Sequence, residues 1–325
     1  MAAKIRFGVQ TGLANVPWDH LLDFWQFLDR ETAFDNVWTF DHFVAPMPGQ
    51  DPGTDCLEGW TALAAAAQAT ERIRLGCLVT GNTYRHPAVL AKMAATVDHI
   101  SRGRLEFGIG TGWHEAEHNA YGIPFPSIKE RSDRLEEAVQ LIRLLFQAEG
   151  PVDFQGKYYQ LKQAPFAPRP VQRPNPPIFI GGGGEKRTLR TVARYGDAIN
   201  VVGTLDFVKH KIGVLEQHCA DVGRDPNEIT KSMCGPLLLY DDEARSQQAR
   251  VAAASISVQN PIAGRPNASA DDLKDQLPIG NAAHIRRVLE RFADAGVDYF
   301  IMMTRAPYKR DIYKRISDEI VSAFA

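Results

Sequence analysis

The chain alternates between short apolar runs and longer segments in which apolar residues recur every three or four positions. Residues 5–11 form the first apolar run, and residues 18–31 follow with Leu21, Trp25 and Leu28 on one helical face. The same rhythm predicts further strands at 36–41, 73–80, 104–110, 177–182, 198–203, 228–240 and 298–304, and further helices at 58–70, 86–101, 127–147, 185–196, 205–223, 285–296 and 309–324. The pattern therefore predicts eight strands, each followed by helical sequence.

Strands separated by helices pair in parallel, and eight such units are typical of an α/β fold, the (β/α)8 TIM barrel. A doubly wound sheet is the alternative, but the even number of strands and the strand at the start of the chain favour the barrel. We expect one barrel domain over residues 1–325, with insertions near 42–57, 150–176 and 241–280. Within the second insertion, the alternating residues 152–162 predict a hairpin.

Composition narrows the class of protein. Of 325 residues, 44% are hydrophobic and 23% are charged, and the net charge is −2, which is typical of a soluble globular protein. This charge gives no reason to expect a nucleic acid or a membrane as partner. The four scattered cysteines and the lack of an apolar stretch long enough to span a bilayer predict a cytoplasmic protein that binds a small molecule.

In a barrel, functional residues lie at the carboxyl ends of the strands. Four consecutive glycines, Gly181–Gly184, follow the fifth predicted strand and precede a helix. The P-loop pattern cannot be written over them. The amides at such a helix start bind anions, and glycine lets a ligand approach the backbone closely, so we predict a phosphate-binding turn.

Two further motifs follow the fourth predicted strand. Residues 108–115, GIGTGWHE, have Trp113 where a dinucleotide-binding motif requires its third glycine. His114 and His118 in the segment HEAEH match the spacing of zinc peptidases. Zinc needs both histidines on one helix face, whereas this motif begins on the glycine loop, with its first histidine ahead of the regular helix. We predict no metal site and expect His118 to be a solvated helical residue.

Asp41 and His42 end the second predicted strand. Histidine titrates near neutral pH and serves as a proton donor or acceptor, and a neighbouring carboxylate orients such a histidine or binds a cofactor ring. The alternative is an aspartate that caps a helix and a half-buried histidine. The glycine loops expected at the same end of the barrel favour a functional role.

Four stretches resemble the bacterial luciferase-like superfamily of flavin and deazaflavin enzymes, in particular its branch that depends on coenzyme F420. The stretches are VWTFDHF (37–43), LEGWTALAAAA (57–67), the segment 72–126 and PIFIGGGGEKRTLRTVARYGDAIN (177–200). The similarity covers almost the whole chain. It is highly specific for the family and less specific for the cofactor.

The resemblance implies a barrel with the cofactor ring across the carboxyl ends of the strands. It implies that His42 lies near the reactive centre and that Gly181–Gly184 hold the cofactor phosphate. It also implies a non-prolyl cis peptide between Leu78 and Val79, in a bulge that supports the ring. The cofactor-binding residues implied in this way are Asp41, Leu78, Val79, Thr80, Thr111, Gly112, Trp113, His114, Gly181, Gly182, Gly183 and Gly184.

Two departures from the family pattern concern the substrate. In the sugar-phosphate dehydrogenases of this superfamily, a glutamate follows the Thr-Gly of the fourth strand and serves as an acid, whereas this chain has Trp113 there. The basic residues that hold the sugar phosphate have no clear counterpart. Both departures predict a substrate other than glucose 6-phosphate.

We therefore predict an oxidoreductase that moves a hydride between coenzyme F420 and a small organic substrate, with His42 as catalytic acid or base. The alternative within the same fold is a monooxygenase that uses reduced FMN. A zinc hydrolase built on HEAEH and a flavin-binding protein without catalysis are two further alternatives.

Aromatic, basic and small side chains near these motifs have expected roles as well. The expected apolar cover of the site consists of Phe43, Trp60, Tyr84 and Trp113. The candidates for pairing with the anionic tail of the deazaflavin are Arg85, Lys186 and Arg187. The alanines at 62–67, 94 and 95 are compatible with a homodimer and equally with packing inside one chain.

Overall fold

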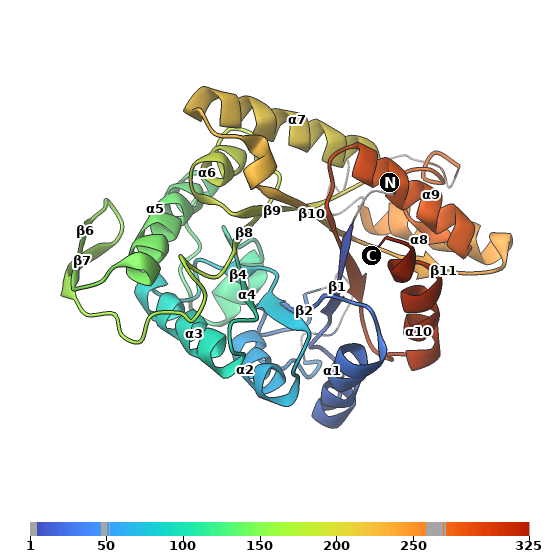
Figure 1. Cartoon of the computed structure of the whole chain (residues 1–325), viewed down its shortest axis with the longest axis horizontal. Coiled ribbons are helices and arrows are strands. Elements are labelled where there is room, and N and C mark those ends of the chain that lie inside the picture. Colours follow the sequence, from blue (N-terminus) through green and yellow to red (C-terminus); the bar gives the residue numbers. More distant parts are fainter. Residues whose placement is uncertain (1–4, 47–50, 52, 258–268, 270, 325) are drawn as a thin grey trace.

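The computed structural model describes residues 5–46, 51, 53–257, 269 and 271–324, and Figure 1 shows its helices around a central set of strands. The strands of the barrel are β1 (Arg6–Thr11), β2 (Asn36–Thr39), β3 (Arg74–Cys77), β5 (Leu105–Gly110), β8 (Ile178–Gly181), β9 (Ala198–Val202), β10 (Thr230–Gly235) and β13 (Tyr299–Thr304). All pairings between them are parallel, and the sheet closes because β3 pairs with both β2 and β5. The predicted TIM barrel is confirmed, and the alternative of an open doubly wound sheet is wrong.

The helices that surround the strands begin and end close to the predicted positions. They are α1 (Trp18–Glu31), α2 (Gly59–Ala69), α3 (Pro87–Ile100), α5 (Ile128–Gln147), α6 (Thr188–Tyr195), α7 (Leu205–Val222), α9 (Ala282–Asp294) and α10 (Arg310–Glu319). The apolar stripe of α1 is buried as its periodicity predicts. No helix within the described ranges is long and apolar enough to cross a membrane.

Short elements that periodicity did not predict lie next to the strands. β4 (Thr80–Gly81) continues the line of β3 after a break and pairs with β5. α4 (Glu115–Ala120) follows β5 directly. Both are too short to show a hydrophobic period, and both lie at the carboxyl end of the barrel.

The barrel interior is filled with side chains. Trp38 packs edge-on against Phe179, whose ring in turn contacts Tyr299 at a centroid distance of 6.0 Å. At the amino end of the strands, the buried carboxylate of Glu106 binds the guanidinium of Arg6 at 2.7 Å. A filled interior with an ion pair at the amino end leaves the carboxyl end as the place for a ligand.

Two excursions leave the alternating series. The predicted hairpin is present as β6 (Val152–Gln155) and β7 (Gln160–Ala164), which projects at the left of Figure 1. The second excursion contains α8 (Glu243–Ser257) and β12 (Ile279–Gly280), which pairs with β11 (Leu238–Leu239). Parts of the predicted insertions, residues 47–50, 52, 258–268 and 270, lie outside the described residues.

One polar contact holds the second excursion together, and another links it to a helix of the barrel. Arg250 of α8 is 1% exposed and donates to the carbonyl oxygen of Ile279 at 3.0 Å. Gln276 accepts the amide of Asp206 through its side chain at 3.0 Å and the amide of Leu205 through its backbone at 3.3 Å. Because these amides lack partners inside their own helix, Gln276 caps the start of α7.

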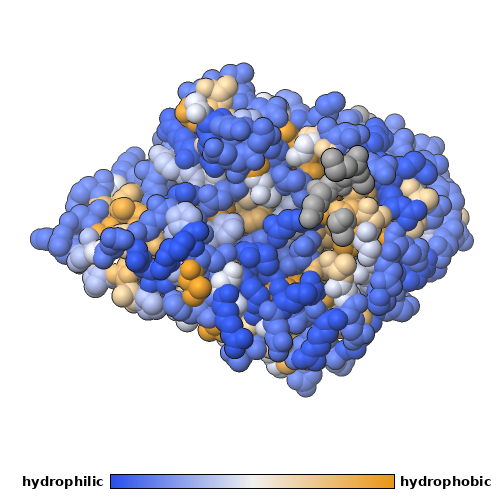
Figure 2. Space-filling view, in the orientation of Figure 1, coloured by the Kyte–Doolittle hydropathy of each residue, from blue (hydrophilic) through white to orange (hydrophobic). Residues whose placement is uncertain are grey.

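Most of the alanines considered for a dimer contact are buried inside the chain, while Ala64 and Ala65 are half-buried. Ala66, Ala67, Ala94 and Ala95 are at most 1% exposed, and α2 packs beside α3. The face in Figure 2 is mostly hydrophilic, with hydrophobic residues in small separate groups. Packing between α2 and α3 therefore accounts for these buried alanines.

Candidate active site

The carboxyl ends of β2 and β5 bring two of the predicted site segments together. The ring of His42 lies 5.4 Å from the indole of Trp113 and 5.7 Å from the ring of His114, measured between centroids. Trp113 is 57% exposed, so its indole lies at the surface beside His42. Gly112 precedes it with a φ of 75°, a conformation that glycine adopts readily, and Thr111 is partly buried.

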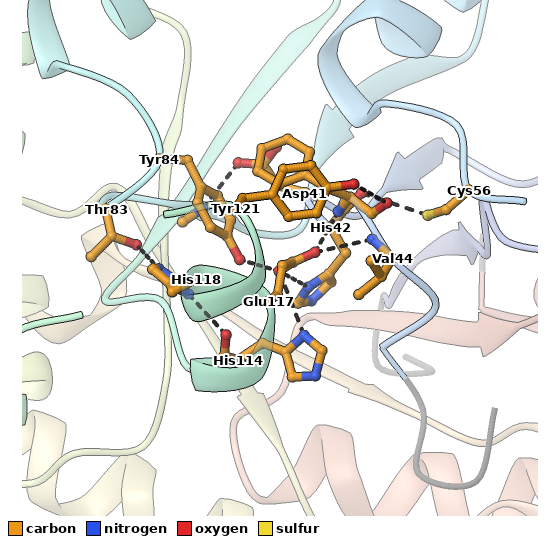
Figure 3. Close-up of polar contacts among 12 residues, drawn as sticks. Asp41, His42, Val44, Cys56, Thr83, Tyr84, His114, Glu117, His118 and Tyr121 are labelled. Atoms are coloured by element: carbon orange, nitrogen blue, oxygen red, sulfur yellow. Dashed lines mark hydrogen bonds and ion pairs between the residues drawn. The ribbon is translucent and has the colours of Figure 1, made fainter. Parts of the chain in front are cut away.

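A buried carboxylate that the sequence did not single out holds the loop that carries His42 (Figure 3). Oε1 of Glu117, on α4, accepts the amides of Phe43 and Val44. Its Oε2 accepts the hydroxyl of Tyr84 and lies 3.0 Å from Nδ1 of His42. Burial alone would raise the pKa of Glu117, but the hydrogen bonds from His42, Tyr84 and Phe43 lower it to about 2. Glu117 is therefore ionised at neutral pH.

The HEAEH segment does not turn its two histidines toward a common ion. His118 is fully buried, with Nε2 2.6 Å from Oγ1 of Thr83 and Nδ1 2.8 Å from the carbonyl oxygen of His114. The expectation of a solvated His118 is wrong, because the short helix α4 turns this side chain inward against the ring of Tyr84. His114 precedes the helix, as expected, and occupies its N-cap position.

A different trio in the described part of the chain has the atoms to hold a metal ion. Ligand atoms of His42, His114 and Glu117 lie within 4.8 Å of one another. However, Nδ1 of His114 is 3.6 Å from Oε2 of Glu117, and that carboxylate already accepts three hydrogen bonds, from Phe43, Val44 and Tyr84. Hydrogen bonding thus accounts for the position of Glu117 without an ion, whereas Nδ1 of His114 is buried with no hydrogen-bond partner among the described residues. The expected lack of a metal stays a prediction.

Asp41 holds the chain segment behind the site. Its Oδ2 accepts the amide of Gly81 at 3.1 Å and the guanidinium of Arg85 at 2.7 Å. The residue is 2% exposed, and its Oδ1 is buried without a hydrogen-bond partner within the described residues. The structure therefore gives Asp41 a clear structural role, and its contact with a cofactor stays a prediction.

The basic residues expected near an anionic tail are largely committed elsewhere. Arg85 binds Glu58 at 2.6 Å in addition to Asp41, and its side chain is 13% exposed. Arg187 forms an ion pair with Asp133. Arg85 is thus unsuited to the role expected for it, because its guanidinium already neutralises two carboxylates.

Val79 lies in a bulge that glycines surround. The peptide bond between Leu78 and Val79 is cis, as the resemblance implies. A Cβ atom on Gly110 or Gly181 would lie 2.8 Å from a methyl carbon of Val79, and one on Gly108 would lie 3.2 Å away. Carbon atoms pack at about 3.5–4.0 Å, so a side chain at Gly110 or Gly181 would overlap with Val79. The first glycine of the run is therefore needed by the protein itself.

Thr80, the residue after the bulge, is buried and does not face the barrel mouth, which is the open end of the barrel at the carboxyl ends of the strands. Thr80 is 0% exposed and accepts the indole N–H of Trp60 at 2.9 Å. Trp60 is 2% exposed and belongs to the core, so its expected role in the cover of the site is wrong. Phe43 and Tyr84 contact each other with ring centroids 4.9 Å apart, and their role in the cover of the site stays a prediction.

The rest of the glycine run has free donors and a nearby cation. The amides of Gly183 and Gly184 have no acceptor within the described part of the chain. Lys211 of α7 is 8% exposed, and its Cε lies 3.3 Å from the position that a Cβ on Gly183 would take. Its Nζ lies 2.6 Å from Oε1 of Glu185. The turn therefore combines backbone N–H groups with a lysine, which is an arrangement that suits a phosphate group.

Sequence patterns did not single out Glu117 or Lys211. For Glu117 a signal was present, because it lies inside the HEAEH segment, but the motif directs attention to its histidines. Lys211 gave no signal, since a lysine on a long helix usually lies in solvent. Only the packing of α7 beside the glycine run reveals it.

The fold is an α/β barrel, a class of protein in which ligands bind at the carboxyl ends of the strands. The chain belongs to the luciferase-like monooxygenase family, whose model matches residues 1–305. An F420-dependent glucose-6-phosphate dehydrogenase of Microbacterium testaceum (strain StLB037) is 26% identical to it, over 99% of this chain and 98% of that protein.

Solved structures agree with this assignment at the level of the fold. An F420-dependent secondary alcohol dehydrogenase in complex with an F420-acetone adduct has a TM-score of 0.81 at 23% identity, over 98% of this chain and 99% of that chain. A monooxygenase from Streptomyces bottropensis has a TM-score of 0.78 at 22% identity, over 99% and 100% of the two chains.

Proposed function

We propose that the chain is an oxidoreductase that uses coenzyme F420 and transfers a hydride between this deazaflavin and a small organic substrate. The observation that carries the proposal is His42, an acid–base side chain placed at the barrel mouth beside the exposed Trp113 and held by a buried carboxylate. Full-length similarity to an enzyme named as F420-dependent supports the choice of cofactor.

The residues of the mouth fit such a cofactor. The free amides of Gly183 and Gly184, with Lys211 beside them, suit its phosphate. Val79 shapes the wall of the mouth between β3 and β5, where the ring would lie. The chemistry that the deazaflavin supplies when bound is hydride transfer, and the protein supplies position and electrostatics.

His42 acts as the acid or base in this proposal. Hydride transfer to a carbonyl carbon leaves negative charge on the oxygen, and a proton from a histidine neutralises that charge. In the reverse direction the same side chain accepts the proton. Removal of such a group typically lowers turnover by about 10²–10⁴-fold.

Trp113 bears on the choice of substrate. Its indole is exposed and offers an apolar surface at the position where the resemblance implies an acid in the sugar-phosphate dehydrogenases. We infer that the substrate presents an apolar part to this residue and is not glucose 6-phosphate. Turnover of glucose 6-phosphate at a rate comparable with that of alcohols or ketones would contradict this inference.

Equilibrium binding to coenzyme F420 and to FMN, in both redox states, tests the proposal. We expect F420 to bind at micromolar or lower concentration and FMN much more weakly. The variant His42→Ala should then lose turnover while its F420 affinity changes by less than about threefold. His99→Ala is the matched control, because this exposed histidine lies near the end of α3, at the opposite end of the barrel. Unchanged turnover in His42→Ala would remove His42 from the chemistry.

A monooxygenase that uses reduced FMN is the second candidate. The observation that favours it is the likeness in fold to the Streptomyces bottropensis monooxygenase. Deazaflavins do not activate oxygen as flavins do, so the two candidates differ in cofactor preference. Tighter binding of reduced FMN than of reduced F420, with oxygen consumption, would replace the first proposal by this one.

We also infer a homodimer in the cytoplasm, as the sequence predicts. The buried alanines of α2 and α3 give no support to a contact through these positions. Light scattering after size-exclusion chromatography measures the mass directly, and a monomer mass at micromolar concentration would contradict the dimer.

A further inference from the structure

We propose that Glu117 is a positioning residue that fixes His42 in one tautomer, with the proton on Nδ1 and the lone pair on Nε2. The inference rests on the proposed function in one respect: it makes Nε2 the nitrogen that exchanges a proton with the substrate. The tautomer itself follows from the hydrogen bonds alone and can be measured without cofactor or substrate.

The first step of the argument is that Glu117 can only accept hydrogen bonds. Its side chain is 0% exposed, and three donors other than His42 surround it, namely the amides of Phe43 and Val44 and the hydroxyl of Tyr84. This set of donors stabilises the ionised carboxylate, which has no proton to give. Nδ1 of His42, at 3.0 Å, must therefore carry the hydrogen.

The second step concerns the other nitrogen. A neutral imidazole has one N–H and one lone pair, so a proton on Nδ1 leaves the lone pair on Nε2. Free histidine in water prefers the opposite tautomer, with the proton on Nε2. The buried carboxylate thus selects the tautomer that is less common in solution, and it orients the ring through the same bond.

The third step is that no neighbouring group replaces Glu117. Nδ1 of His114 lies 3.6 Å from Oε2 of Glu117, beyond hydrogen-bond distance, and burial lowers the pKa of His114. Burial, and to a smaller degree the charge of Glu117, raise the pKa of the Cys56 thiol to about 12, so this neighbour is neutral. Burial and the bond to Glu117 raise the pKa of Tyr84. Of these neighbours, Glu117 is therefore the one that presents a charge to His42.

Glu117 also ties the ring to its backbone. The amides of Phe43 and Val44 follow His42 directly in the chain, and both bind the carboxylate that binds the ring (Figure 3). The ring and the next two residues therefore move as one unit with α4. Such a unit keeps Nε2 at a constant position relative to the mouth, which is what a proton transfer to a bound substrate requires.

The test uses the full chain labelled with ¹⁵N only at histidine. Long-range ¹H–¹⁵N correlation spectra distinguish the two tautomers of each neutral ring, and His42→Asn identifies the His42 signals by their loss. We expect the Nδ1–H tautomer for His42 in the wild-type protein, both alone and with F420. A dominant Nε2–H tautomer in the wild type would overturn the proposal outright, whatever the variants do.

Three variants separate positioning from general structure. In Glu117→Gln, the amide oxygen can still accept the amides of Phe43 and Val44 while its NH₂ group faces His42, so the tautomer should change to Nε2–H. Glu115→Gln, on the exposed side of α4, should leave the tautomer unchanged. Tyr84→Phe removes another donor to Glu117 and should also leave it unchanged. Retention of the Nδ1–H tautomer in a folded Glu117→Gln protein would refute the role of Glu117.

Kinetic data then connect the tautomer to catalysis. Glu117→Gln should lower kcat by about 10²-fold or more, with the KM and the F420 affinity within about threefold of wild type. If His42→Ala keeps full turnover, the proposed function of His42 fails while the tautomer result still stands, so the two failures are distinguishable. If chelator treatment of the wild type shifts the His42 signals, the trio with His114 holds a metal ion and the proposal is wrong.

Discussion

The contact between Gly181 and Val79 gives a prediction that separates two reasons for the glycine run. If Gly181 is glycine only because a ligand approaches it, Gly181→Ala should weaken ligand binding and leave the ligand-free protein as stable as before. The structure predicts instead that the ligand-free protein itself is destabilised. A Cβ at this position would lie 2.8 Å from both methyl carbons of Val79, about 1 Å closer than carbon atoms pack.

The magnitude follows from the overlap. An extra methyl group in a well-packed site typically destabilises a protein by about 1–3 kcal/mol, because neighbouring side chains and backbone must shift. With an unfolding entropy of about 2.1 cal/mol/K per residue, a chain of 325 residues has about 0.7 kcal/mol/K in total. The same destabilisation should therefore lower the Tm by about 1.5–4 °C.

Urea unfolding of the ligand-free protein measures this change, with Gly213→Ala as a matched control. Gly213 lies in α7 with no atom within 4 Å of an added Cβ, so alanine there should stabilise the protein by about 0.5–1 kcal/mol. The double variant Gly181→Ala/Val79→Ala should recover about 1 kcal/mol or more relative to additivity, because the smaller side chain removes the overlap. An unfolding free energy of Gly181→Ala within about 0.5 kcal/mol of wild type would refute the reasoning.

Three further predictions concern charges. Because the pKa of Glu117 is lowered to about 2 from an ordinary 4.5, its ionised form stabilises the folded state above pH 4.5, and this contribution is lost as the pH falls toward 2. The difference in unfolding free energy between wild type and Glu117→Gln should therefore shrink by up to about 3 kcal/mol between pH 4.5 and 2, and a difference independent of pH would contradict the shift. Arg85→Met should destabilise the protein by about 3–5 kcal/mol in urea unfolding, because it leaves the buried carboxylate of Asp41 without its partner, and adding Asp41→Asn should recover most of the loss. Arg250→Met should speed proteolytic cleavage within residues 241–280, detected by mass spectrometry, since it removes the bond to Ile279; unchanged cleavage would show that the excursion does not depend on this bond.

The sequence was sufficient for the barrel because its signals are local and repeated. The helix at 18–31 has the predicted bounds, since its apolar stripe and its flanking residues are all contained in one segment. The resemblance located the cis peptide at Leu78 and placed His42 at the mouth. Each of these features can be recognised within a few neighbouring residues.

The parts that were missed depend on contacts between distant segments. Contacts with Thr83 and Tyr84 decide which side of α4 faces inward. Neither the burial of His118 nor the hydrogen bond between His42 and Glu117 can therefore be predicted from the sequence of the helix alone. Likewise, the sequence was compatible with Trp60 in the cover of the site, whereas the structure places Trp60 in the core, where it donates a hydrogen bond to Thr80. Side-chain contacts between distant segments, rather than the local sequence pattern, decide whether these residues are buried.

The capping of α7 by Gln276 has a consequence for the evolution of the fold. Barrels acquire new substrates largely by changing the loops at the carboxyl ends of their strands, which assumes that a loop can be exchanged without disturbing the rest. Here the excursion supplies the acceptors for the first amides of α7, and α7 carries Lys211 beside the glycine run. If Lys211 and the glycine run hold the cofactor phosphate as proposed, an exchanged excursion without such an acceptor should alter cofactor affinity together with substrate range.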